Sequence, residues 1–151
     1  MAQGRLRTRP IPSVNVTATE AAYIAGLIDG EGSINISPIR GRAMGATITV
    51  YNSNREMLDW CCAKTGVGTV NAGGGNKKEA HHKTVYRWGV YARQDVVGLV
   101  PTVRPFLISK ATQADALLVF CERRLSGTPY GQDDHALRDA VLAANDRSVA
   151  A

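Results

Sequence analysis

The side chains that could bind another molecule alternate with apolar residues in short segments of this 151-residue sequence. Residues 33–37 and 47–51 alternate polar with apolar side chains, and residues 69–71 and 83–91 continue the pattern. An alternation of period two places the two kinds of side chain on opposite faces of a β-sheet. The outward face would carry Ser33, Asn35, Ser37, Thr47, Thr49, Tyr51, Thr69, Asn71, Lys83, Val85 and Arg87.

The residue types on this face suit the base edges of a nucleic acid. Asparagine can form two hydrogen bonds with adenine and arginine two with guanine, each pair worth roughly 1–3 kcal/mol of discrimination between bases. A two-stranded ribbon is also narrow enough to enter the major groove. A merely solvated sheet face is the alternative, although such a face has no need of Arg or Lys.

Basic residues cluster in the two loops that join these segments. The loop after residue 37 carries Arg40 and Arg42, and the loop before residue 84 carries Lys77, Lys78, His81, His82 and Lys83. We expect these side chains to contact phosphates at the flanks of the sheet. The distribution of charge also favours phosphate contacts. Residues 1–110 hold 14 basic and 7 acidic residues, whereas residues 111–151 hold 4 basic and 6 acidic ones. A basic surface of this kind attracts a polyanion.

A predicted helix precedes the first polar segment. Residues 19–30 place Ile24, Leu27 and Ile28 on one face, and Thr17 or Thr19 can cap the start. A second face carries the small residues Ala22, Gly26 and Gly30, four positions apart. Such a row allows a second helix to approach closely, or allows the helix to pack inside its own core.

The remaining elements complete an α+β pattern. Further helices are expected at residues 55–64, 93–100, 106–125 and 133–146. Antiparallel hairpins with one polar face and helices on the other give an αββαββα core, a four-stranded antiparallel saddle sheet backed by helices, with C-terminal helices added. We expect a basic N-terminal arm over residues 1–18 and one domain over 19–151, with its core at 19–126 and a C-terminal helix at 132–147.

Residues 24–32 read Ile-Ala-Gly-Leu-Ile-Asp-Gly-Glu-Gly. This segment resembles the LAGLIDADG signature of homing endonucleases, with six of nine letters identical. A second segment, Pro-Phe-Leu-Ile-Ser-Lys at 105–110 followed by Gln113 and Ala114, is similar to the same family. The resemblance covers about residues 19–126 and includes the αββαββα order.

The resemblance implies roles for individual residues. Glu31 takes the position of the family's metal-binding carboxylate, and the Gly30 carbonyl is a further ligand. Phosphodiester hydrolysis then uses Mg²⁺, with Mn²⁺ or Ca²⁺ able to substitute in binding. Lys110 matches a basic residue near the cleavage site, and Asn52 matches a residue that positions water, although an Asn that starts a turn is a competing interpretation. Asp29 is expected to form hydrogen bonds near the helix end.

The implied function is a site-specific homing endonuclease. It would bind a long, near-palindromic double-stranded DNA site as a homodimer that pairs through Ala22, Gly26 and Gly30. It would hydrolyse one phosphodiester in each strand, giving a staggered break, in the service of intron or intein mobility. The alternatives are a non-cleaving nucleic-acid-binding protein, either a maturase-like RNA splicing helper or a transcription regulator, and an interaction protein that only dimerises through the glycine face.

Other classes of protein are disfavoured by the composition. No apolar run reaches the roughly 18 residues of a membrane span, and the N-terminus lacks the apolar segment of a secretion signal. We therefore expect a cytoplasmic protein, or one of an organellar matrix, with no membrane partner and no small-molecule substrate. Cys61, Cys62 and Cys121 show no metal-binding spacing and are interpreted as core residues.

Overall fold

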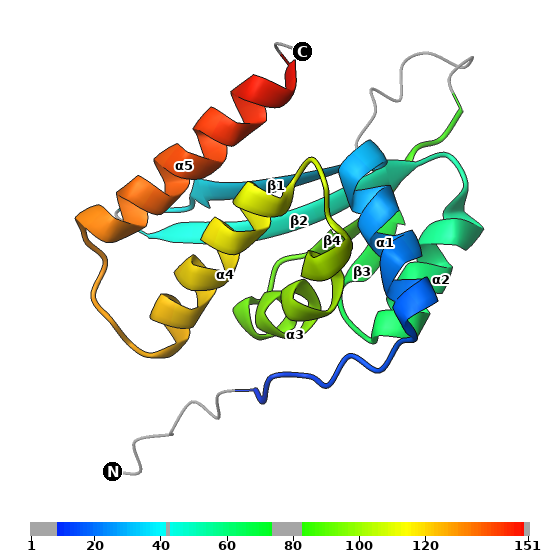
Figure 1. The fold of residues 1–151 in the computed structure, drawn as a ribbon, viewed down its shortest axis with the longest axis horizontal. Helices are drawn as coiled ribbons and strands as arrows, with labels where there is room; N and C mark the ends of the chain where they lie inside the picture. The colour runs from blue at the N-terminus through cyan, green and yellow to red at the C-terminus, as the bar shows by residue number, and fades with distance from the viewer. Residues whose placement is uncertain (1–8, 42, 74–82, 150–151) are drawn as a thin grey trace.

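A four-stranded antiparallel sheet with helices on one face forms the protein (Figure 1). The computed structural model describes residues 9–41, 43–73 and 83–149. The elements are α1 (Ala18–Glu31), β1 (Gly32–Pro38), β2 (Met44–Asn52), α2 (Arg55–Thr65), β3 (Thr69–Ala72), β4 (Tyr86–Val90), α3 (Arg93–Val103), the 3₁₀ turn η1 (Arg104–Phe106), α4 (Ala111–Leu125) and α5 (Gln132–Val149). The strand order is β1-β2-β4-β3, and the expected α+β class with C-terminal helices is confirmed.

Helix α1 starts at a capping box formed by Thr17, one of the two caps predicted from the sequence, and Glu20. The Thr17 hydroxyl accepts the Glu20 N–H at 3.1 Å, and the Glu20 carboxylate accepts the Thr17 N–H at 3.2 Å. Ile24 and Ile28 are buried along one side of the helix. The helix ends at Glu31, and β1 follows without a loop. The end of α1 is therefore fixed directly against the edge of the sheet.

The register of the sheet confirms the predicted alternation. Ser33 lies opposite Thr49 and Asn35 opposite Thr47, whereas Ile34 and Ile48 between them are buried. In the other half, Arg87 lies opposite Tyr51 on one side and opposite Asn71 on the other. Its neighbour Trp88 is fully buried, and the indole N–H donates to the Val67 carbonyl at 3.0 Å.

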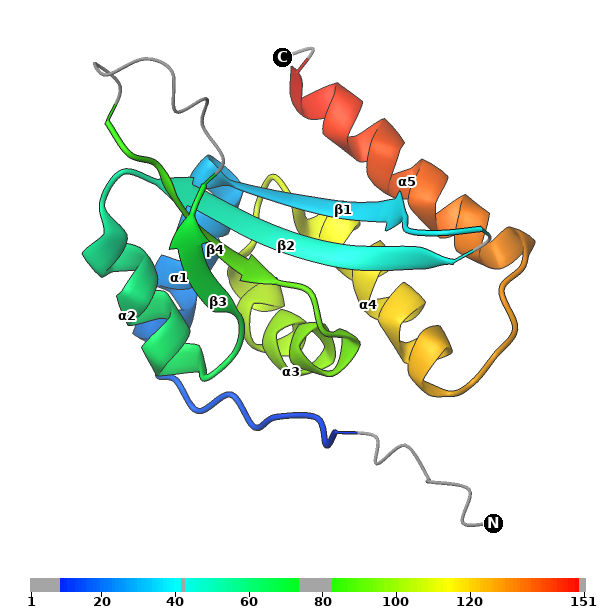
Figure 2. The ribbon, with the colours of Figure 1, turned by 180° about the vertical axis from the view of Figure 1, so that it is seen from behind.

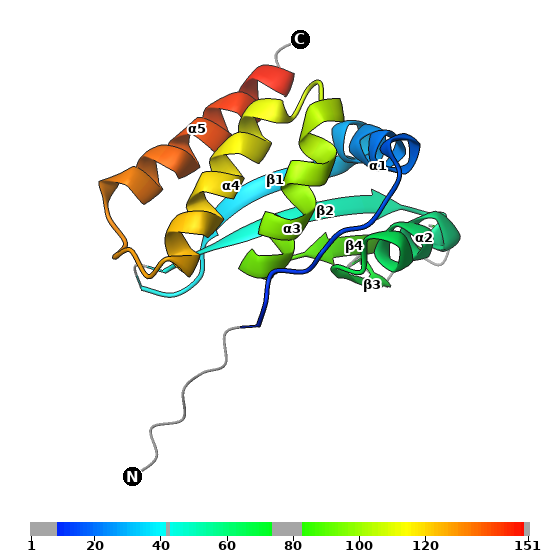
Figure 3. The same ribbon diagram turned by 60° about the horizontal axis from the view of Figure 1, so that its bottom comes forward.

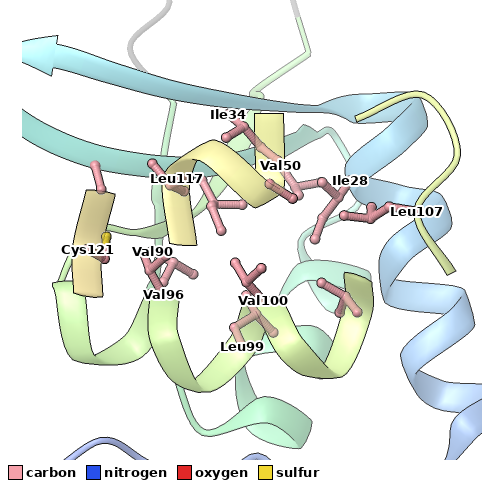
Figure 4. Close-up of a cluster of buried hydrophobic side chains, with 14 of the residues drawn as sticks. Ile28, Ile34, Val50, Val90, Val96, Leu99, Val100, Leu107, Leu117 and Cys121 are labelled. Carbon is pink, nitrogen blue, oxygen red and sulfur yellow. The ribbon is translucent and has the colours of Figure 1, made fainter. Parts of the chain in front are cut away.

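The hydrophobic core lies between the sheet and helices α1, α3 and α4 (Figure 3). Figure 4 shows Leu99 and Val100 of α3 and Leu117 of α4 gathered beneath Val50 and Ile34 of the sheet. Cys61 and Cys121 are buried and unpaired. Burial raises the pKa of the Cys61 thiol to about 11 and that of Cys121 to about 12, so both remain protonated at neutral pH. Their interpretation as core residues is confirmed.

The long helix expected from residue 106 begins later, at Ala111. Helix α3 continues through the exposed Pro101 as far as Val103, and the η1 turn follows. Residues 107–110 are then held outside a helix because the backbone N–H groups of Ile108 and Lys110 donate to the Asp29 carboxylate. This contact with α1 is a tertiary one, which the local sequence cannot reveal.

The C-terminal helix α5 packs on α4 and along the edge strand β1. The Asn145 amide donates to the Ile34 carbonyl at 3.2 Å and to Asn35 Oδ1 at 3.2 Å. Gln113 of α4, which is buried, donates to Asn145 Oδ1 at 3.1 Å. Helix α5 thereby covers part of a strand edge that would otherwise expose its backbone groups. Within the described residues, no helix is long and apolar enough to cross a membrane.

Candidate active site and nucleic-acid interface

Asp29 joins the end of α1 to the segment that precedes α4. Its two carboxylate oxygens accept the Ile108 N–H at 2.7 Å and the Lys110 N–H at 3.0 Å. The hydrogen-bonding role expected for Asp29 is thus confirmed, and its partners lie about eighty positions further along the chain. The two segments that carry the sequence resemblance are brought together by this one side chain.

Lys110 places its ammonium group at the same end of α1. Its Nζ donates to the Asp29 carbonyl oxygen at 2.6 Å. The last carbonyls of a helix lack intrahelical partners and carry the negative end of the helix dipole, which favours a cation. Helix α1 has no basic residue in its own last turn, so Lys110 supplies the missing positive charge.

Glu31 is the terminal residue of α1, and its side chain is exposed. Among the described residues, no basic side chain forms an ion pair with it. Its carboxylate and the adjacent Gly30 carbonyl are hard oxygen donors, which fit Mg²⁺ or Ca²⁺. The described part of the chain contains no cluster of three His, Cys, Asp or Glu side chains able to hold a metal. The Glu31 carboxylate and the Gly30 carbonyl would fill only part of the ligand shell of such an ion.

Asn52 occupies the last position of β2 and takes part in a local turn. Its side-chain oxygen accepts the Asn54 N–H at 2.8 Å, and Asn54 in turn caps α2 by accepting the Met57 N–H. The register pairs β1 with β2 only as far as Val50, so Asn52 lies beyond the paired region of these strands. Its role in positioning water stays a prediction.

The outward face of the sheet has no helix over it in the described chain, as Figure 2 shows from behind. Hydrogen bonds order its polar side chains before any ligand arrives. The Ser33 and Thr49 hydroxyls lie 2.9 Å apart, and Asn35 donates to Ser33 at 3.4 Å. Thr49 is only 7% exposed, whereas Thr69 and Asn71 at the opposite edge are open to solvent.

The flanks of the face are only partly described. Arg40 is exposed at the tip of the β1–β2 hairpin, where the Ala43 N–H donates to its carbonyl and Gly41 adopts a positive φ of 58°. Lys83 and Val85 are exposed before β4, and Ser37 is exposed at the end of β1. The remaining predicted contacts lie outside the described residues: Arg42, Lys77, Lys78, His81 and His82.

The row of small residues on α1 is exposed along its whole length. A Cβ added to Gly26 or to Gly30 would meet no atom within 4 Å, and Ala22 is exposed too. Ile108, which is 89% exposed, follows η1 and is attached to the same end of α1 by its N–H. Ile108 was predicted to lie inside a helix, and its exposure was not expected, because the preceding Phe106 and Leu107 make it look like part of an apolar run.

A second residue missed from the sequence is Tyr91, just beyond β4. Its ring lies on the outward face across Gly89, in contact with the position that a Cβ there would occupy. The Arg87 guanidinium lies 5.8 Å from the centre of this ring. The signal was the spacing Arg87, Gly89, Tyr91, which puts all three residues on one face of a strand.

Comparisons with solved structures find homing endonucleases. The structure resembles homing endonuclease I-CvuI in complex with the I-CreI target, at a TM-score of 0.66 and 18% identity over 83% of this chain and 82% of that one. It resembles the archaeal intron-encoded I-Vdi141I complexed with DNA, at a TM-score of 0.67 and 18% identity over 85% and 96%. For LAGLIDADG homing endonuclease I-GzeII in complex with its DNA target, the TM-score is 0.60 and the identity 13% over 87% and 44%. The chain has the LAGLIDADG homing endonuclease fold. No family model matches the sequence, and no curated protein matches it either.

The LAGLIDADG fold positions the residues of the candidate site relative to one another. Helix α1 carries the motif segment except for Gly32, and its last residue, Glu31, comes directly before the first strand. Lys110, held by Asp29, lies at the end of this helix, and the polar sheet face begins at Ser33. The arrangement brings a carboxylate, an ammonium group and a surface suited to nucleic acid together at one end of one helix.

Proposed function

We propose that this protein is a site-specific endonuclease that cuts double-stranded DNA as a homodimer with Mg²⁺. Each copy would contact half of a long, near-palindromic site through its outward sheet face and hydrolyse one phosphodiester, so that the two cuts leave staggered ends. The observation that carries the proposal is the end of α1, where Glu31 is exposed and the Lys110 ammonium binds the Asp29 carbonyl, directly before the open polar face begins.

The homodimer follows from what one protomer lacks. Each copy has one exposed carboxylate at the end of α1, that of Glu31, and each copy exposes a helix face of Ala22, Gly26 and Gly30 that fits a second helix. A two-fold axis along α1 would bring two Glu31 side chains together, which is costly unless cations lie between them.

Each residue at the end of α1 has a distinct task in the proposed mechanism. Glu31 and the Gly30 carbonyl would hold the cation, which polarises the scissile phosphate and activates a water molecule. The Lys110 ammonium is held at the Asp29 carbonyl, where it can stabilise negative charge that develops on the phosphate. Ions of this kind accompany related structures, since I-CvuI complexes were solved with 2 mM Mg or 2 mM Ca present.

We place these functions in one domain, residues 19–151, with residues 1–18 as an arm. The described part of the arm lies along α3, where Arg9 pairs with Asp95 at 2.5 Å. A Cβ on Gly98 would come within 2.7 Å of the Pro12 carbonyl, so the contact is close. The arm would thus be anchored on the helical side. Intron or intein mobility is the biological setting that we propose for the cleavage.

The experiment that tests the function selects duplexes from a random DNA library. The purified protein is given Mg²⁺ in one arm, where cut molecules are recovered, and Ca²⁺ in the other, where bound molecules are recovered. We expect both arms to return the same near-palindromic sequence. Bound duplexes that are never cut in Mg²⁺ would support the non-cleaving binder, and recovery of structured RNA in preference to duplex would support the splicing helper.

The metal assignment is tested by Glu31→Gln. Removing the charge should abolish cleavage of the selected duplex, by a factor of about 100 or more, because a neutral amide binds Mg²⁺ poorly. Binding in Ca²⁺ should change much less. Glu122→Gln, an exposed position on α4, is the matched control and should cut normally. Cleavage that survives Glu31→Gln would show that another group holds the ion.

A further inference from the structure

The Tyr91 ring lies over Gly89 on the outward face of the sheet, where the glycine leaves room for it. Trp88 and Val90 point into the core and are fully buried, so the residue between them faces outward. A Cβ at that position would overlap the Tyr91 ring, and glycine avoids the overlap. Gly89 lies opposite Thr49 in β2 and opposite Thr69 in β3, so the ring covers the middle of the sheet.

The ring lies within cation–π distance of the Arg87 side chain. The guanidinium carbon lies 5.8 Å from the ring centre, which is within the range of a cation–π contact. In the described chain, no carboxylate forms an ion pair with Arg87. The residues opposite it are Tyr51 in β2 and Asn71 in β3, both exposed and neither acidic.

We propose that Arg87, oriented by Tyr91, reads one guanine in each half of the DNA site. This inference deepens the proposed function and rests on it. Arg87 is the residue that touches the base, through two parallel hydrogen bonds to guanine O6 and N7. Tyr91 is a positioning residue that keeps the planar guanidinium from sampling other directions. Gly89 leaves the space that the Tyr91 ring occupies.

The position of Arg87 on the sheet favours contact with a base over contact with a phosphate. Phosphate-binding side chains are expected at the flanks of the face, as Arg40 is at a hairpin tip. Arg87 lies on β4, an inner strand with a neighbour on each side. A cation in the middle of a ribbon that enters the major groove faces the base edges. A cation in contact with a ring has also lost part of its freedom before binding, which favours a planar, bidentate contact.

The test measures base preference by selection of bound duplexes in Ca²⁺, with wild type and Arg87→Ala. Wild type should show a guanine at one position in each half-site. Arg87→Ala should lose the preference there by roughly 5- to 150-fold and keep the other positions. Arg40→Ala is the matched control, expected to weaken all sequences alike and to lower the salt slope of binding by about one.

Tyr91 variants test the positioning role with a readout that a structural role would not move. Tyr91→Phe keeps the ring and should keep the guanine preference, whereas Tyr91→Leu keeps an apolar cover on Gly89 but removes the π face. We expect Tyr91→Leu to lower the preference severalfold at the position read by Arg87, without changing the thermal midpoint of unfolding by more than a few degrees.

Three outcomes would overturn the inference. Arg87→Ala could retain every base preference, or it could behave like Arg40→Ala, which would make Arg87 a phosphate contact. In both cases the proposed nuclease function would stand. A wild-type protein that selects no duplex at all would overturn the function and the inference together, so the two failures are distinguishable.

Discussion

At the scale of single residues, the site depends on Asp29 as much as on Glu31. Asp29 uses its carboxylate to fasten residues 108–110 and its backbone carbonyl to hold the Lys110 ammonium. The motif predicted that Asp29 forms hydrogen bonds near the helix end. It could not reveal the partners, because they lie in a segment about eighty residues away. The exposure of Ile108 was missed for a similar reason, since its N–H binds the distant Asp29, whereas Tyr91 was missed although its spacing from Arg87 and Gly89 is visible in the sequence.

Lys110 gives a prediction at this scale. Lys110→Met keeps the length and apolar stem of the side chain but removes the charge. Cleavage of the selected duplex should fall on the order of 100-fold, since the transition state loses a charged donor. Binding in Ca²⁺ should fall far less. Single-turnover cleavage rates measure the effect. Lys64→Met on α2 serves as the control, because Lys64 forms an ion pair with Glu20 and does not bind the end of α1. A rate for Lys110→Met within threefold of wild type would remove Lys110 from the mechanism.

At the scale of elements, the sequence predicts the order of helices and strands well. Alternation at 33–37 and 47–51 and the Thr17 cap are local signals, and local signals set those elements. The start of α4 and the docking of α5 are set by tertiary contacts. Asn145 reaches from α5 to the edge of β1 and to Asn35, and nothing in the helical pattern around Asn145 indicates such a partner.

The connection between α4 and α5 is held by a buried ion pair. Asp134 is fully buried and accepts hydrogen bonds from Arg123, Arg124 and the Gly131 N–H. Burial alone would raise the pKa of Asp134, but the Gly131 N–H and the two arginines outweigh it and hold the pKa below its ordinary value of 3.8. A carboxyl with a lowered pKa stabilises the fold above its unfolded pKa, and this contribution is lost as the pH falls through the folded value.

Asp134→Ala should therefore lower the free energy of unfolding by about 3 kcal/mol at pH 7, because Arg124 is left buried without its partner. The difference in the free energy of unfolding from wild type should have its full size above about pH 5 and should become smaller as the pH falls below that value. Urea unfolding from pH 2.5 to 7 measures it. Asp133→Ala removes an exposed partner of Arg123 and should cost less than about 1 kcal/mol. If the difference in the free energy of unfolding between wild type and Asp134→Ala stays constant across this pH range, the ion-pair explanation is wrong.

At the scale of the whole molecule, the sheet has one face covered by helices and one face open. The helices fill one side of the sheet and leave the other side open, so the α+β class and the polar face follow from alternation and charge (Figure 2). The pairing of two copies does not follow from any contact within the chain. It is proposed from an exposed row of small residues on α1, from the exposed Ile108 and from the exposed Glu31 carboxylate at the end of α1.

The central claim is that each of two paired copies cuts one strand with its own Glu31. A mixed dimer tests it directly: wild type and Glu31→Gln carry different affinity tags, are co-expressed, and are purified through both tags. The selected duplex is labelled at the 5′ end of each strand in turn and analysed on denaturing gels after incubation with Mg²⁺. The account predicts that each mixed dimer nicks a single strand and leaves the other intact. Cleavage of both strands by the mixed dimer, or full cleavage by a wild-type protein that sediments as a monomer on its DNA, would contradict it.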